Sequence, residues 1–332
     1  MIDHLRSRTL FGSPLVAVYD VDCCAPRGDC SGEESSSRHS VVFPRSGVFI
    51  KQTSKNDRLV AECTRVLFFN RHESYRVSHP VAGGDNCTSI HFNQAALVDF
   101  IYSIDPSIEN SSNRPFRSSA AICSVSIALT LHRLRRLLLT QRPVEPLVVE
   151  EICASLLAQS LTSTDHQRGT VRRPIRAITR QAHRDLVDAT RIVLARRFRE
   201  KLSLGEIARA VFSSPFHLAR IFRRETGVSL HRQLTGLRLR RAIEHLTNGS
   251  ADLTMLALDL GFSSHAHFTQ AFGSEFGFAP SELREQLSAR DLRGVRIVEI
   301  DTRELNRIGN KLPLEDRQES NRASYGGRLG FC

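Results

Sequence analysis

The sequence predicts a two-domain α+β protein, with a β-rich N-terminal domain that also contains helices and an all-α C-terminal domain. Three observations support this fold class. Short β-branched and aromatic runs, separated by turn residues, fill 40–92. A 16-residue motif of helical character occurs at 212–227 and again at 262–277. A polar and basic stretch at 162–180 lies between the two regions and is typical of a linker.

Length and charge limit the possible functions. A chain of 332 residues can form two domains with separate cores, and its net charge of +11 favours a polyanionic partner such as nucleic acid. No stretch approaches the roughly 20 consecutive apolar residues that a membrane helix needs, and the first residues do not resemble a secretion signal. We therefore expect a cytoplasmic protein without membrane contact, whose cysteines are reduced.

The N-terminal domain is predicted to span 1–165. Alternating runs bounded by turn residues predict an antiparallel barrel or sandwich, and the Gly- and Ser-rich segment 27–37 predicts a loop. The predicted strands are 15–20, 40–43, 47–52, 59–63, 66–69 and 88–92.

Two helical stretches follow the strands, at 118–139 and 145–161. Their apolar faces have no obvious third layer to cover them, so the sequence predicts a homodimer through these helices, with Leu156 in the contact. A linker is predicted at 166–182 and a flexible tail at 289–332, because both are polar and charged.

The internal repeat is the most informative feature. Its two copies are identical at seven of sixteen positions, which predicts a shared structure. In each copy a serine, Ser214 or Ser264, can cap a helix, and a glycine, Gly227 or Gly277, can end it.

A short apolar helix is predicted before each copy, with Ser203 and Thr254 as the N-caps. Each copy therefore forms a predicted helix-turn-helix motif, at 203–227 and 254–277, inside a domain at 183–288. A helix predicted at 230–246 would be about 25 Å long, of the order of the ~34 Å between successive major-groove faces. One monomer could thus place both second helices against double-stranded DNA; simple packing of helical hairpins is the alternative.

This region resembles the DNA-binding domain of the AraC/XylS family of bacterial transcription regulators. The resemblance rests on LGEIARA at 204–210, HLARIFRRETG at 217–227, LRLRRA at 237–242, ALDLGF at 257–262 and PSELR at 280–284. It implies base-facing positions on both second helices, with caps and arginines beside them at the phosphates. The implied DNA-binding residues are Ser214, Phe216, Ala219, Arg220, Arg223, Arg224, Ser264, His265, Ala266, Thr269 and Gln270. Gln270 and Gly273 stand where this family usually has basic residues.

The N-terminal half is similar to a sensor region of the same family, through FPRSGVF at 43–49 and YRVSHPVAGGD at 75–85. This resemblance implies a cupin-like β-barrel with dimerisation helices, an unidentified small-molecule effector, and RNA polymerase as a partner of a transcriptional activator. It implies no enzyme activity and no cofactor.

Two alternatives remain from the sequence. His72, His79 and His91 suggest a metal-dependent cupin enzyme fused to a DNA-binding module, although no HxH pair precedes a suitably spaced Glu and His. Cys23, Cys24 and Cys30 match neither a CxxC pair nor a zinc knuckle, so we expect no metal. The other alternative is a DNA-binding dimer that needs no ligand.

Overall fold

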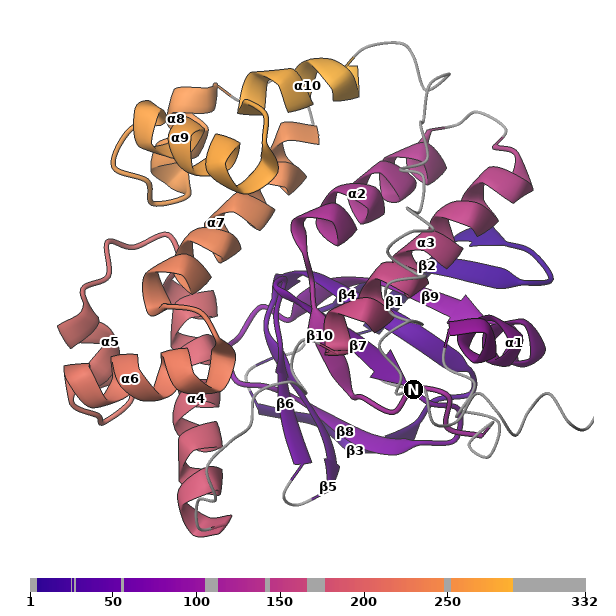
Figure 1. Cartoon of the computed structure of the whole chain (residues 1–332), viewed down its shortest axis with the longest axis horizontal. Helices are drawn as coiled ribbons and strands as arrows, with labels where there is room; N and C mark the ends of the chain where they lie inside the picture. Colours follow the sequence, from indigo (N-terminus) through magenta and orange to yellow (C-terminus); the bar gives the residue numbers. More distant parts are fainter. Residues whose placement is uncertain are drawn as a thin grey trace, which may run out of the picture.

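The computed structural model describes residues 5–24, 26, 28–54, 57–104, 113–140, 144–165, 177–247 and 252–288. Two antiparallel sheets and helices α1 to α3 form the N-terminal part, and helices α4 to α10 form the C-terminal part (Figure 1). The predicted β-rich and all-α halves are confirmed. No helix in the described ranges combines the length and the apolar character that a membrane span requires.

The ten strands make one six-stranded and one four-stranded sheet, with only antiparallel pairs between the described strands. The six-stranded sheet has the order β1 (Leu5–Gly12), β2 (Val16–Cys23), β9 (Asp85–Phe92), β4 (His39–Gly47), β7 (Arg65–Phe69) and β10 (Ala120–Ile122). The four-stranded sheet has the order β3 (Gly28–Ser35), β8 (Ser74–His79), β5 (Phe49–Ser54) and β6 (Asp57–Ala61).

The N-terminal domain has three layers because alternate side chains of a strand point to opposite faces. In β7, Val66 and Phe68 pack with the helices, whereas Leu67 and Phe69 pack in the core that includes Phe49 of the second sheet. The six-stranded sheet therefore lies between helices on one face and the four-stranded sheet on the other.

The helices of this domain are α1 (Gln94–Ile104), α2 (Val125–Leu139) and α3 (Pro146–Asp165). Their core-facing apolar residues are covered by the six-stranded sheet within one chain, which corrects the expectation that no third layer covers 118–139 and 145–161, and the placement of Leu156 in a dimer contact. Leu156 is fully buried in the same core as Val18 and Ile90 of the sheet. The sequence did not reveal a sheet wide enough to cover these helices on one face while its other face packs on the four-stranded sheet.

Several elements were not predicted. The segment 27–37, predicted as a loop, contains β3, which pairs with β8. β3 has few β-branched or apolar residues, so its strand conformation depends on pairing with a neighbour rather than on its own pattern. β1 and α1 were not predicted either. The stretch predicted as a helix from residue 118 contains β10, and α2 begins only after it.

The C-terminal part contains two cores that share one helix. Its elements are α4 (Ala177–Arg197), α5 (Leu204–Ala210), α6 (Pro215–Thr226), α7 (Leu230–Thr247), α8 (Leu253–Asp259), α9 (His265–Phe276) and α10 (Pro280–Ser288). Leu234 and Leu237 of α7 pack in the core formed by α4, α5 and α6, and Leu239 and Ile243 pack with α8, α9 and α10. The predicted linker lies outside the described residues at 166–176, its last six residues begin α4, and the predicted tail at 289–332 lies outside them too.

Leu156→Ala is expected to lower the free energy of unfolding by about 2–5 kcal/mol, because it leaves a cavity in the core of the N-terminal domain. Urea denaturation of the full chain measures this loss. Leu147→Ala, at a residue of the same helix that is 57% exposed, is the matched control and should change stability little. A Leu156→Ala protein of unchanged stability but altered sedimentation would return this residue to a subunit interface.

Candidate nucleic-acid interface

The two repeat copies fold as helices α6 and α9, and both end as predicted. Gly227 and Gly277 take left-handed conformations, with φ of 78° and 80°, at the C-caps. The Ser264 hydroxyl accepts a hydrogen bond from the His267 amide at 3.1 Å. Ser214 has the extended backbone of an N-cap, but its side chain makes no capping bond, and Pro215 follows it at the first helical position.

The shorter helices α5 and α8 begin differently. Ser203 caps α5 in a capping box, in which its hydroxyl and the Glu206 carboxylate each accept from the other residue's backbone amide. Thr254 does not cap α8. Asp252 does so instead, because α8 begins at Leu253 and the Asp252 carboxylate can accept from the orphan amide of Thr254, at 2.8 Å.

The turns inside the two helix pairs also differ. Gly261 has a φ of 83°, and a Cβ atom at this position would lie 2.4 Å from the Arg199 carbonyl oxygen, so only glycine fits. In the first pair Phe212 has a φ of 52° and is fully exposed, whereas its repeat partner Phe262 is 2% exposed. The two turns therefore have different backbone conformations.

The residues implied by the family resemblance share an outward orientation. Ala219 and Thr269 are half-buried, and the other nine are exposed: Ser214, Phe216, Arg220, Arg223, Arg224, Ser264, His265, Ala266 and Gln270. The opposite faces hold Leu218, Ile221 and Phe222 in α6 and Phe268 and Phe272 in α9, all buried. Phe216 is the largest apolar side chain on the outward faces and is 86% exposed.

The arginines of α6 have different partners. The Arg224 guanidinium lies 2.9 Å from the Glu225 carboxylate and donates to His183 Nδ1 at 2.5 Å. Burial, and then the positive charge of Arg224, lower the pKa of His183. Arg220 makes only a long contact of 3.5 Å with His217 among the described residues, and Arg223 has no ion pair with them. Arg220 and Arg223 therefore carry the less compensated charges of this face.

Helix α7 determines the distance between the two pairs. It has 18 residues, which corresponds to about 27 Å, close to the predicted length. The pairs α5–α6 and α8–α9 lie near its two ends, away from the sheets (Figure 1). Arg238 fixes α7 to the end of α4 by donating to the Phe198 and Glu200 carbonyls, each at 2.7 Å.

A buried carboxylate connects these helices to the N-terminal domain. Glu62 follows β6, is 1% exposed, and accepts from Arg191 of α4 at 2.7 Å and from Gln233 of α7 at 3.2 Å. It also accepts from the Thr64 amide and hydroxyl at 2.7 and 2.6 Å. The sequence analysis missed Glu62; its only signal is a lone charge in an apolar run, and Arg191 lies 129 positions away.

Further contacts join α7 to the six-stranded sheet. Arg45 of β4 lies 3.5 Å from the Glu244 carboxylate, and its carbonyl accepts from Arg241 at 3.4 Å. Arg240 donates to the Cys123 carbonyl after β10 and also lies 4.0 Å from Glu275 of α9. The helix between the two repeat copies thus also contacts the six-stranded sheet.

A pocket of about 480 Å³ lies at the other end of the same sheet. Its walls come from the β1–β2 turn, the starts of β4 and α1, the end of β9 and the turn after β7. They carry two arginines and two histidines but no acidic residue, beside apolar side chains. The lining includes Leu15, Val16, Arg38, His39, Arg71, His91 and Phe92.

The histidines of this pocket are held neutral. Burial, and then the charge of Arg38, lower the pKa of His91 to about 4. Burial, and then Arg71, lower the pKa of His39 as well. His39 Nδ1 accepts from the Arg71 amide at 3.0 Å, so Nε2 carries the proton, and this buried atom has no partner among the described residues.

The three histidines that suggested a metal-dependent cupin do not converge. His91 lines the pocket, His72 lies exposed in the turn before β8, and His79 ends β8 in contact with Asp85. The usual histidine centre of such an enzyme is therefore absent from the described part of the chain.

Comparison with known proteins finds similarity in the C-terminal region. A helix-turn-helix domain model matches residues 207–286. The transcriptional regulator ArgR of Pseudomonas aeruginosa is 32% identical over 113 residues, covering 34% of each chain. The transcriptional activator RhaS of Escherichia coli is 32% identical over 88 residues, covering 26% of this chain and 32% of RhaS. The chain thus spans about a third of the length of these relatives.

Solved structures show weaker similarity. ToxT of Vibrio cholerae is 12% identical, with 86% of this chain and 100% of ToxT covered and a TM-score of 0.32. The C-terminal domain of AraT from Geobacillus stearothermophilus is 24% identical, with 34% of this chain and 94% of that domain covered and a TM-score of 0.31.

Glu62→Gln is expected to lower the free energy of unfolding by about 3 kcal/mol, because it leaves the Arg191 guanidinium buried without its counter-charge. Urea denaturation of the full chain checks this value. Glu200→Gln removes an exposed partner of Arg197 and serves as the matched control, with little expected change. Equal stability of the two variants would mean that the buried pair does not hold the domains together.

Proposed function

We propose that this chain, which carries an AraC-type helix-turn-helix domain, regulates transcription by binding specific sequences of double-stranded DNA. The observation that carries the proposal is the pair of outward faces on α6 and α9, held at the two ends of α7. We assign each helix pair as a helix-turn-helix motif whose second helix enters the major groove. Relatives of the matched region are transcription regulators, which supports this assignment.

The roles of the side chains follow from their chemistry. The Arg220 guanidinium can bond bidentately to guanine, Gln270 can do so to adenine, and Phe216 and Ala266 can contact thymine methyl groups. His265 and Thr269 offer further groups for base edges. Ser214, Ser264 and Arg223 are placed at the ends and flanks of the two helices, where we assign them to phosphates. Arg224, predicted as a phosphate contact, is already paired with Glu225 and so contributes less.

The two motifs differ in charge. Residues 171–250 contain 18 Arg and Lys against 6 Asp and Glu, a net charge of +12. Residues 251–290 contain 2 against 5, a net charge of −3. Because release of counterions from phosphates supplies much of DNA affinity, we infer that the first motif dominates affinity and the second mainly discriminates between sequences.

This division of roles predicts distinct variants. Arg220→Ala should cost about 1–3 kcal/mol of binding and relax the preference at one base step, whereas Gln270→Ala should change preference in the other half of the site. Arg223→Ala should weaken binding to all sequences and reduce the salt slope by about 1. Arg224→Ala is its matched control and should change the slope less.

The measurement begins with selection of bound duplexes from a random pool by the full-length protein, followed by titrations over a range of salt concentrations. Failure to enrich any sequence would overturn the proposed function. Enrichment with binding that depends on Gln270 and not on Arg220 would overturn the division of roles alone.

The remaining parts of the proposal concern regulation. We propose a cytoplasmic homodimer without catalytic activity, which activates transcription through RNA polymerase and responds to a small-molecule effector bound by a cupin-like sensor domain. Leu156 is buried within one chain, so the proposed dimer contact of these helices would involve their exposed residues, such as Leu139 and Leu147, in place of Leu156.

The pocket at the end of the sheet is our candidate for the effector site. Its two arginines and the absence of acidic lining residues suit an oxyanion, and Leu15 and Phe92 suit an attached apolar group. β4 begins at His39 in the pocket and reaches Arg45, which contacts α7. A ligand that favours one position of β4 would therefore bias the arrangement of the two motifs.

Phenylacetate, hexanoate or glycerol 3-phosphate should raise the melting temperature of the full chain, since a ligand bound to the folded state adds stability. Phenylacetamide and glycerol, which lack the charge, should not. Arg38→Ala should abolish the rise, and Arg209→Ala, an exposed arginine of α5, should leave it unchanged. Absence of any rise with the three anions, or an equal rise in Arg38→Ala, would contradict an oxyanion site here.

A further inference from the structure

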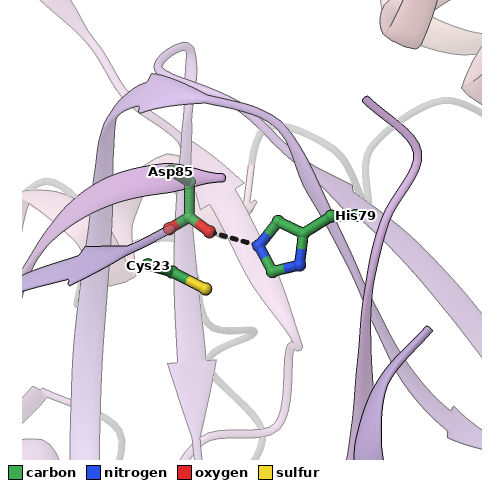
Figure 2. Close-up of side chains that lie close together, drawn as sticks. All are labelled: Cys23, His79 and Asp85. Atoms are coloured by element: carbon green, nitrogen blue, oxygen red, sulfur yellow. Dashed lines mark hydrogen bonds and ion pairs between the residues drawn. The ribbon is translucent and has the colours of Figure 1, made fainter. Parts of the chain in front are cut away.

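The side chains of Cys23, His79 and Asp85, each of which carries a metal-binding atom, meet where the strands β2, β8 and β9 end or begin (Figure 2). One ligand atom of each residue, namely sulfur, imidazole nitrogen and carboxylate oxygen, lies within 4.8 Å of the other two. His79 and Asp85 are buried, and Cys23 is half-buried. In Figure 2 the Asp85 carboxylate faces the imidazole of His79, and the Cys23 sulfur lies beside both.

The three residues are fixed by the pairing of strands. Cys23 ends β2 and is paired directly with Asp85, the first residue of β9, so their side chains share one face of the six-stranded sheet. His79 ends β8 and pairs with Gly28 in the four-stranded sheet. The cluster therefore joins the two sheets, and a bound ion would cross-link them.

The spacing of the ligand atoms suits a small ion. Tetrahedral zinc with bonds of about 2.0–2.3 Å separates its ligand atoms by roughly 3.3–3.6 Å. His79 Nε2 lies 2.7 Å from Asp85 Oδ1, so an ion between them requires an opening of roughly half an ångström. The three ligand atoms lie within 4.8 Å of one another, so the change that binding requires is of side-chain size.

The surroundings position the carboxylate. The Cys87 thiol donates to Asp85 Oδ2 at 3.0 Å, which is the outer hydrogen bond that a metal-bound carboxylate usually accepts. Gly47 of β4 lies so close that a Cβ atom there would be 2.7 Å from the Asp85 Cα. The start of β9 is thus packed tightly against β4, and Asp85 is held in place before any ion binds.

We propose that Cys23, His79 and Asp85 bind one divalent transition-metal ion, with zinc as the preferred ion. A thiolate, an imidazole and a carboxylate form a mixed set that suits borderline zinc better than the hard ions calcium and magnesium. One thiolate and one carboxylate also neutralise the charge of a divalent ion in a buried place. Binding releases the thiol proton of Cys23 to solvent, and water takes the fourth position of the ion.

A buried ion pair between His79 and Asp85 is the simpler explanation of their contact, and it does not involve the Cys23 sulfur. The two interpretations differ in whether sulfur binds the ion. The sequence analysis expected no metal because it searched for ligands close in sequence. Here the ligands come from three strands, and none of the familiar short spacings connects them.

The test uses the full-length protein after removal of metals with a chelator. Zinc added in competition with a chromophoric chelator should bind at one ion per chain, and cobalt should give the near-ultraviolet absorption band of a thiolate–cobalt bond. Cys23→Ser should abolish that band, and Asp85→Asn should weaken zinc binding at least about tenfold. Cys24→Ser, at the exposed neighbouring cysteine, is the matched control and should keep both.

A wild-type protein that takes up neither ion, or a cobalt spectrum without the thiolate band, would overturn the site, and neither result depends on the folding of a variant. Loss of the band in Cys24→Ser with its retention in Cys23→Ser would also overturn it. DNA binding by the metal-free protein is a separate measurement, so failure of the metal site leaves the proposed function untouched.

Discussion

The carboxylate of Glu62 lies buried between the two domains, where it accepts hydrogen bonds from α4, from α7 and from its own turn. A charge in such a place is costly unless it is paired and fully hydrogen-bonded, and Arg191 and Gln233 meet both conditions. Because these partners lie on the two helices that support the first repeat copy, that copy cannot shift relative to the sheets without exposing or unpairing the charge.

Helix α7 extends this constraint to the second copy. One half of the helix packs in the first core and the other half in the second core, while Arg240 and Arg241 contact backbone carbonyls of the N-terminal domain. The same helix thus sets the spacing of the two outward faces and connects them to the sheets. We propose that a shift of β4 in the sheet changes the position of α7 and thereby DNA binding. This coupling requires no separate signalling element.

Features fixed by neighbouring residues were predictable from the sequence. The glycine caps of α6 and α9, the Ser203 N-cap and the length of α7 depend on local geometry, and the structure has them where the sequence analysis expected them. Thr254 is not the cap because α8 begins two residues earlier than predicted, and Asp252 accepts from the Thr254 amide. Features that depend on distant partners were missed. β3 becomes a strand through β8, Leu156 is buried by a sheet, and Glu62 finds Arg191 far along the chain. The residues near each of these positions in the sequence do not indicate its partner. The three-dimensional structure is needed to identify it.

The three adjacent strands β2, β9 and β4 place two different chemistries at opposite ends. At the pocket end, Phe92 pairs with Val16 and with His39 in the neighbouring strands. At the cluster end, Asp85 pairs with Cys23 and with Gly47. Strands of eight residues separate the two ends by roughly 24 Å. Arg45 lies near the cluster end and pairs with Glu244 of α7. Anything that stiffens the cluster end would therefore hold β4 firmly against α7 while the pocket end stays free to respond. A metal ion joining the sheets would do this, so the proposed ion and the proposed effector have complementary roles: one fixes the contact with α7, and the other shifts the strand that leads to it.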